Sequence, residues 1–103
     1  MGVKLIVLYP PAKDQAAFDA RYEREHLPMG AENLAGATRL VSSRIIGSPS
    51  GAPAFVRITE VSFPSKEVLQ ATAKSAGGKK TIANAVEISS GGAPVFLVAE
   101  ENA

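Results

Sequence analysis

The chain begins with a run of residues, 3–9, that is apolar at every position except Lys4. β-branched and aromatic residues favour a strand, and the two prolines that follow cannot continue its hydrogen bonding. A strand with one face in water alternates between apolar and polar side chains, and this run does not alternate. We therefore expect a first strand that is covered on both faces.

The next segment carries apolar side chains at helical spacing. Asp14 is of a residue type that caps the N-termini of helices. The side chains of Phe18, Tyr22 and His26 recur at every fourth position, so they lie on one face of the helix. Because a residue that precedes proline avoids the helical conformation, the pattern predicts that this helix ends at Leu27-Pro28.

Two further apolar segments, 38–46 and 54–63, flank a loop rich in serine, proline and glycine. Within the loop, Ser48-Pro49-Ser50-Gly51 has proline at the second position and glycine at the fourth, which suits a type I turn. The pattern predicts two strands joined as a hairpin.

The C-terminal part predicts more helix and a last strand. Ser65 is suited to cap a helix that ends at Gly77-Gly78. The run 77–81 lacks the first glycine of a phosphate-binding loop, so we interpret its glycines as a helix terminator. A short helix follows between residues 79 and 87, and residues 94–99 form a strand that is apolar on both faces.

The order of these elements is β-α-β-β-α-β. This order is typical of the ferredoxin-like α+β fold, a four-stranded antiparallel sheet with its helices on one face. Residues 1–103 then form one domain, and the helices cover only one side of the sheet. Because the first strand is apolar on both sides, we expect a second copy of the chain to cover the open face and form a homodimer.

Composition and charge exclude several classes of protein. The chain has 103 residues and no cysteine, which rules out disulfides, a thiolate nucleophile and cysteine-based metal sites. A net charge of +1 gives no reason to expect nucleic acid or an anionic membrane as a partner. The first apolar run is too short for a signal peptide or a membrane span, so we expect a cytoplasmic protein.

His26 is the one histidine and the side chain best suited to transfer protons near neutral pH. Tyr22, one turn earlier, is placed to orient it or to donate a hydrogen bond to a substrate oxygen. Phe18 and Tyr9 are candidates for the wall of a substrate cavity. The alternative for His26 is structural, since a histidine in the last turn of a helix can bond the free carbonyls there.

Arg44 and Arg57 lie on neighbouring strands of the predicted hairpin, where a half-buried guanidinium can bind a substrate carboxylate. An arginine in such a place also often pairs with a carboxylate of the protein itself. No motif for a metal or an organic cofactor is present in the sequence, so we expect neither.

Residues 4–9, the spaced Phe18, Tyr22 and His26 before Leu27-Pro28, the central hairpin and the closing strand together resemble the EthD family. The family is named for ethyl tert-butyl ether degradation. The resemblance implies a ferredoxin-like fold that pairs as a dimeric α+β barrel, with a cavity between sheet and helices and His26 at its edge. The chain departs from the family pattern at residues 77–80 and at Asn84, where an aspartate is often found.

The sequence leaves three functions open. The first is a cofactor-free catabolic isomerase, in which His26 moves a proton next to the carbonyl of a small, mostly apolar oxygenated molecule such as a lactone. The second is a cofactor-independent monooxygenase that acts in the same cavity. The third is a non-catalytic binding or accessory protein.

Overall fold

A computed structural model describes residues 2–102 of the chain. Its sheet consists of β1 (Val3–Tyr9), β2 (Arg39–Arg44), β3 (Arg57–Phe63) and β4 (Val95–Glu100) in the order β2-β3-β1-β4. All neighbouring strands are antiparallel. This is the predicted ferredoxin-like arrangement, with the first and third strands at the centre of the sheet.

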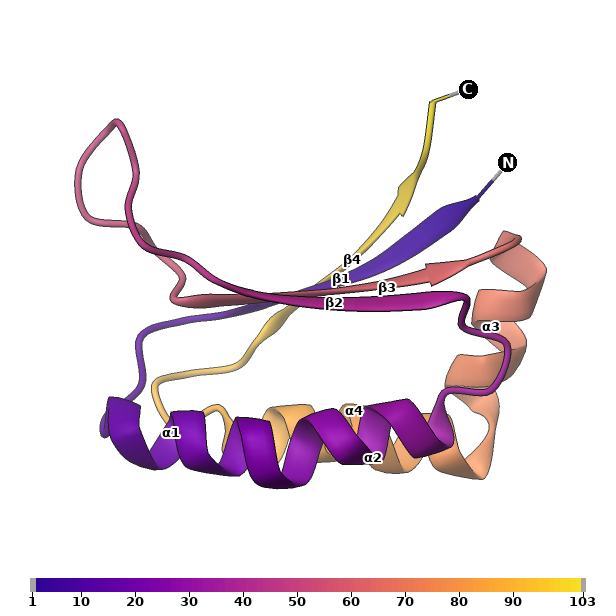
Figure 1. Cartoon of the computed structure of the whole chain (residues 1–103), viewed down its shortest axis with the longest axis horizontal. Coiled ribbons are helices and arrows are strands. Elements are labelled where there is room, and N and C mark those ends of the chain that lie inside the picture. The colour runs from indigo at the N-terminus through magenta and orange to yellow at the C-terminus, as the bar shows by residue number, and fades with distance from the viewer. Residues whose placement is uncertain (1, 103) are drawn as a thin grey trace.

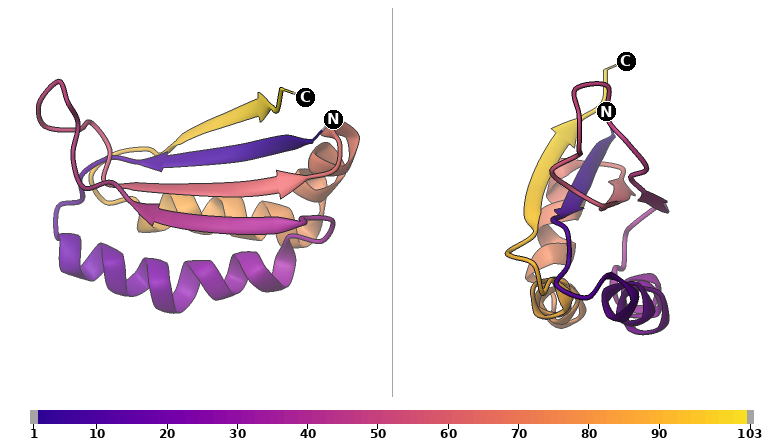
Figure 2. Two further views of the ribbon diagram at one scale, coloured as in Figure 1. Left: turned by 45° about the horizontal axis from the view of Figure 1, so that its top comes forward. Right: turned by 90° about the vertical axis from the view of Figure 1, so that its left-hand side faces the viewer.

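The helices form a layer on one face of the sheet, as Figures 1 and 2 show. The first is a continuous rod made of α1 (Gln15–Arg21), a π-helical turn η1 (Tyr22–His26) and α2 (Leu27–Asn33). The second part comprises α3 (Lys66–Lys74) and α4 (Ala76–Ile88). No helix within residues 2–102 is long and apolar enough to cross a membrane.

The core lies between the sheet and this helical layer. Tyr9 of β1 and Tyr22 of η1 are completely buried, and Phe18 packs with them. A second cluster around Val61 and Phe63 fills the end of the sheet near α3. The two clusters flank the space in which the candidate site lies.

The prediction that the first helix ends at Leu27-Pro28 is wrong, because Pro28 lies in the first turn of α2 and the rod continues to Asn33. The N–H of Leu27 bonds the carbonyl of Tyr22, five residues earlier, which is the hydrogen bond of a π-helix. A change of hydrogen-bond register before Pro28 accommodates its missing N–H and its ring. Proline is also tolerated in the first turn of a helix.

The prediction that Gly77-Gly78 end the second helix is wrong as well. The chain breaks at Ser75, whose extended backbone ends α3 and whose hydroxyl oxygen accepts the N–H of Gly78 to cap α4. The glycines lie in the first turn of α4 because neighbouring backbone is too close for side chains. A Cβ on Gly78 would lie 1.9 Å from the carbonyl oxygen of Thr72, and one on Gly77 would lie 2.7 Å from that of Asn33.

The hairpin is confirmed, although its strands are shorter than predicted. Strands β2 and β3 pair antiparallel, and the chain from 45 to 56 forms the loop. Gly51 donates its N–H to the carbonyl of Ser48, as the predicted turn requires. Figure 1 shows this loop projecting from the side of the sheet opposite the helices.

The face of the sheet opposite the helices is not covered by any described part of the chain (Figure 1). The register places Ile6, Leu8, Ile58 and Leu97 on this open face. Leu97 is 47% exposed, whereas the three others are partly shielded by neighbouring side chains. The open face therefore combines these apolar side chains with the Lys4–Glu60 ion pair, and no described part of the chain covers it.

Candidate functional site

His26 lies in the middle of the long helical rod, at the end of its π turn, and is 6% exposed. Its two ring nitrogens have different partners. Nε2 lies 3.2 Å from the hydroxyl of Tyr9 on β1, and Nδ1 lies 2.8 Å from the amide oxygen of Asn84 on α4. The imidazole is therefore held between the sheet and the second helical segment.

The partners of Asn84 determine which nitrogen of His26 carries the hydrogen. The amide nitrogen of Asn84 donates to Glu25 Oε1 at 3.1 Å, and a carboxylate can only accept. The amide oxygen of Asn84 then faces His26 and accepts from Nδ1–H. In the neutral ring Nε2 has a free electron pair, which accepts the hydrogen bond from the Tyr9 hydroxyl.

Burial sets the charge state of this pair. Loss of hydration lowers the pKa of His26, and the opposing effects of Asn84 and of the Glu25 carboxylate are smaller. Burial and the nearby Tyr22 raise the pKa of Tyr9, so its hydroxyl keeps its proton. His26 is a neutral base and Tyr9 a hydrogen-bond donor at neutral pH.

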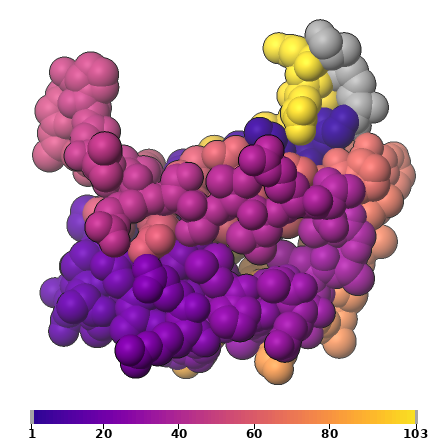
Figure 3. Space-filling model, viewed as in Figure 1, coloured from indigo at the N-terminus to yellow at the C-terminus, as the bar shows by residue number. Residues whose placement is uncertain are grey.

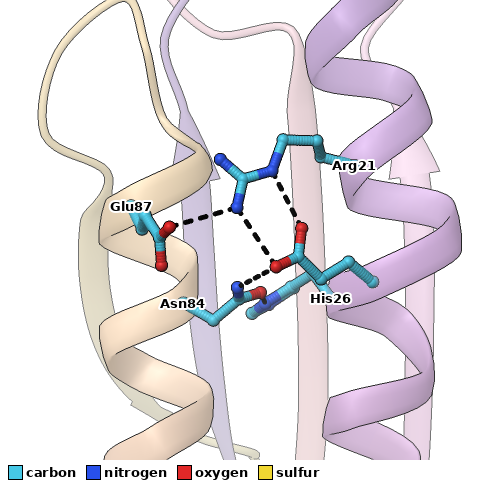
Figure 4. Close-up of polar contacts among 5 residues, drawn as sticks. Arg21, His26, Asn84 and Glu87 are labelled. Carbon is cyan, nitrogen blue, oxygen red and sulfur yellow. Dashed lines mark hydrogen bonds and ion pairs between the residues drawn. The ribbon is translucent and has the colours of Figure 1, made fainter.

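The network continues to the surface through Glu25. Arg21 binds both oxygens of this carboxylate, with contacts of 2.8 and 3.1 Å, and also reaches Glu87 on α4 at 3.2 Å. Figure 4 shows Arg21 between the two helical segments, above Asn84 and His26. The hydrogen bond from Arg21 lowers the pKa of Glu25, which holds this group as a carboxylate.

His26 also lines a cavity between the sheet and the helices. The cavity is partly open to solvent and offers about 40 Å³ to the centres of water-sized molecules, and Figure 3 shows the surface hollowed between β2 and α2. Its lining is mainly apolar and includes Leu5, Val7, Leu40, Val61, Phe63 and Phe96 from the sheet and Leu27, Leu34, Leu69, Ile82 and Ala85 from the helical layer. Of the described lining residues, His26 alone is ionisable.

The hydroxyl groups around the cavity are already bonded to the protein. Thr59 shares a hydrogen bond with the hydroxyl of Tyr22, Thr72 donates to the carbonyl of Ala35, and Thr81 donates to that of Gly77. Both ring nitrogens of His26 are likewise bonded within the protein, so a molecule in the cavity gains a polar contact with the histidine only by displacing one of these hydrogen bonds.

The chain is similar to solved structures of known proteins. An EthD family protein from Bacillus halodurans is 31% identical, with 99% of this chain and 100% of that chain covered and a TM-score of 0.91. The chain belongs to the EthD family. A second structure, an EthD-like protein from Ralstonia eutropha, is 28% identical over 96% of this chain and 90% of that one, with a TM-score of 0.72.

More distant structures share the fold of this EthD protein. A dimeric ferredoxin-like protein of unknown function from Jannaschia sp. is 14% identical, covers 98% of this chain and all of that chain, and has a TM-score of 0.73. Neither the family models nor the curated proteins give a match.

The predicted aromatic residues gather beside His26 in this EthD protein. The rings of Phe18 and Tyr22 stack with centroids 5.7 Å apart, and Tyr22 lies at the same distance from the imidazole. Phe18, Tyr22 and His26 thus share one face, as the spacing predicts. Tyr9 packs against all three rings.

The hydroxyl next to His26 belongs to Tyr9 and not to Tyr22. The Tyr22 hydroxyl bonds Ser42 and Thr59 on the sheet instead. Tyr9, Phe18 and Tyr22 are not among the lining residues of the cavity, so their contact with a substrate stays a prediction.

The two candidate arginines do not line the cavity either. Arg57 is buried, lies over the ring of Tyr22 at 4.4 Å and pairs with Asp19 at 3.2 Å and Glu23 at 3.7 Å. It matches the alternative in which such an arginine pairs with the protein's own carboxylates. Arg44 is exposed at the end of β2, and binding of a substrate carboxylate there stays a prediction.

The structural alternative for His26 is wrong in the form that the sequence suggested. His26 makes no capping hydrogen bond, because the rod does not end there and its carbonyls are not free. Among residues 2–102, no three histidine or carboxylate side chains gather as ligands for a metal ion.

Asn84 and Glu25 are the site residues that the sequence did not reveal. In the sequence Asn84 stands out only as a departure from the EthD pattern, and its contact with His26 joins positions 58 residues apart. Glu25 follows an ordinary exposed pattern in the sequence. Only the packing of α4 against the π turn brings Asn84 to the histidine and to Glu25, which directly precedes His26 in that turn.

Proposed function

We propose that this EthD protein is a cofactor-free catabolic enzyme that isomerises a small, uncharged, mostly apolar carbonyl compound such as a lactone or enol. One observation supports the proposal above the others. A neutral histidine, the one ionisable group among the described lining residues, lies at an apolar cavity with its Nε2 electron pair directed to a protonated tyrosine.

In the proposed reaction, His26 acts as general base and then as general acid. A C–H bond next to the carbonyl breaks, its proton moves to Nε2, and the electron pair moves to the carbonyl oxygen to give an enolate. Nε2 then returns the proton to a different carbon of the same molecule. No oxidant or further reactant is consumed.

In this proposal Tyr9 is the hydrogen-bond donor to the substrate oxygen, a role that the sequence suggested for Tyr22. Once substrate approaches Nε2, the Tyr9 hydroxyl is free to donate to the developing enolate oxygen, which stabilises charge where it forms. Its raised pKa keeps the hydroxyl protonated for this purpose. The Tyr22 ring packs against the imidazole and supports its orientation.

The test is incorporation of deuterium from D2O into a panel of small lactones and enolisable ketones, followed by NMR. We expect exchange with the wild type and with Lys80→Ala, an exposed control on α4, and a loss of at least 100-fold with His26→Gln. Circular dichroism verifies that each variant is folded.

Exchange that persists in folded His26→Gln would defeat the proposal. Consumption of oxygen in proportion to product from phenols would show the monooxygenase instead. Tight binding of these compounds without exchange over hours would show a binding or accessory protein.

We also propose that a second copy of the chain covers the open face, to form a dimeric α+β barrel. The apolar residues of that face support this pairing, because a large exposed apolar patch is rare in monomers. The structure from Jannaschia sp., which shares the fold, is described as dimeric.

A further inference from the structure

We propose that Asn84 and Glu25 are positioning residues, which select the hydrogen-bonding state of His26 in which Nε2 is the free base. The inference rests on the proposed function for its catalytic meaning. The selection itself is a property of the hydrogen-bond network and is measurable without a substrate.

The Glu25 carboxylate determines how the Asn84 amide is turned. Glu25 Oε1 accepts one hydrogen bond from Arg21 and one from Asn84, both at 3.1 Å. Because a carboxylate has no hydrogen to donate, only the NH2 group of Asn84 can face it. Glu25 thus fixes the orientation of an amide whose two ends have the same shape.

The orientation of the Asn84 amide in turn determines which nitrogen of His26 carries the hydrogen. If Asn84 were turned over, its oxygen would face the Glu25 carboxylate and its NH2 group would face Nδ1 of His26. Two acceptors would then oppose each other at 3.1 Å, and one hydrogen bond would be lost at a site where Asn84 is 5% exposed. The observed orientation, with hydrogen on Nδ1, is favoured for this reason.

The same residues act on the protonated ring. When Nε2 takes a proton, both nitrogens donate, Nδ1 to the Asn84 oxygen and Nε2 to the oxygen of Tyr9. The groups facing His26 are Tyr9 from β1, Asn84 from α4 and Glu25 from its own rod, and Glu25 is the nearby negative charge among them. The Asn84 amide separates the imidazole from the Glu25 carboxylate. The negative charge therefore acts on the ring, but the two groups do not form an ion pair.

The outermost contact offers a matched control. Arg21 also binds Glu87, but the Glu87 side chain is 66% exposed and contacts neither Asn84 nor His26 in the network (Figure 4). Glu87→Gln changes the same chemical group as Glu25→Gln and leaves the contact between Glu25 and Asn84 intact. The two variants therefore separate the positioning effect from a loss of surface charge.

The experiment measures the 15N shifts of the imidazole in protein labelled at histidine, which are unambiguous because the chain has one histidine. We expect hydrogen on Nδ1 in the wild type and in Glu87→Gln at pH 8, and a mixture of both tautomers in Glu25→Gln. The double variant Glu25→Gln, Asn84→Asp restores hydrogen on Nδ1, since the introduced carboxylate can only accept.

The activity assay supplies the second readout. We expect kcat for exchange to fall roughly tenfold or more in Glu25→Gln with KM little changed, and to recover in the double variant with its pH profile moved to higher pH. The carboxylate introduced by Asn84→Asp would stabilise the imidazolium, which a merely structural role would not reproduce.

Hydrogen on Nε2 in the wild type, or an unchanged tautomer in Glu25→Gln, would overturn the inference whatever the activity. If the tautomers behave as expected but no compound exchanges, the proposed function fails while the positioning role of Asn84 and Glu25 stands.

Discussion

His26 combines two opposing influences on one side chain. Its burial removes water from the charged form and lowers its pKa, while the Asn84 oxygen and the Glu25 carboxylate favour the charged form. Burial is the larger effect, so the neutral ring is the native state near pH 7.

From the lowered pKa of His26 we predict that the protein loses stability as pH falls below about 6.5, the ordinary pKa of histidine. The pKa is lowered in the folded chain, so the unfolded chain takes up a proton first and is favoured by acid. Above this pH the histidine is neutral in both the folded and the unfolded chain, so it no longer makes stability depend on pH. Urea unfolding at pH 7.5 and 5.5 measures the difference in the free energy of unfolding.

His26→Gln is the control for the pH prediction, because it removes the one histidine of the chain. The difference in unfolding free energy between pH 7.5 and 5.5 should shrink in this variant. The contribution of Glu25, whose pKa is lowered, is lost only at more acidic pH. A wild type that is equally stable at both values would contradict the burial argument.

Among the elements, two irregular points position the site. The π turn shifts the hydrogen-bond register of the first rod just before Pro28, and His26 lies at its end. The break at Ser75 starts α4 so close to α3 that only glycine fits at Gly78. Asn84 lies further along α4, so the start of this helix determines where the amide meets the histidine.

We therefore predict that Gly78→Ala destabilises the protein by about 1 to 3 kcal/mol or more, despite the better helix propensity of alanine. The added Cβ would lie 1.9 Å from the carbonyl oxygen of Thr72, so backbone must move. Thermal unfolding measures the loss, and 1 kcal/mol corresponds to roughly 4–8 °C in a domain of this size.

Gly47→Ala is the matched control for Gly78→Ala. Nothing lies within 4 Å of a Cβ at Gly47, which stands in the hairpin loop. We expect this variant to be neutral or slightly more stable, because alanine restricts the unfolded chain. Equal stability of the two variants would show that the close approach at Gly78 carries no cost.

For the whole molecule, the helical layer leaves one side of the sheet uncovered, including the apolar side chains on that side. The hairpin loop projects on this same side (Figure 1), and its Ile46 is 93% exposed. The proposed second copy of the chain would cover both this face and the side chain of Ile46. The cavity and its histidine lie on the opposite side, within the single chain.

We predict that Leu97→Glu shifts the protein from dimer to monomer in size-exclusion chromatography with light scattering. A charge placed on the open face would be buried without a partner in the dimer. Val86→Glu is the control, since Val86 is similarly exposed, at 50%, but lies on α4. A monomeric wild type at micromolar concentration would contradict the pairing.

The sequence by itself determined the order of the elements, the antiparallel sheet and the shared face of Phe18, Tyr22 and His26. These features depend on local spacing and on residue types, which a chain shows directly. The predicted helix ends at Leu27-Pro28 and at Gly77-Gly78 are wrong. At both places the packing of distant segments outweighs the local preferences of proline and glycine.

Tertiary structure alone decided the partners of His26. Tyr9 comes from β1 and Asn84 from α4, and no spacing along the chain relates either of them to the histidine. The charge state of the ring depends on burial, which exists only once sheet and helices have closed over it. The sequence thus named the candidate base, and the fold set its tautomer and its neutral charge.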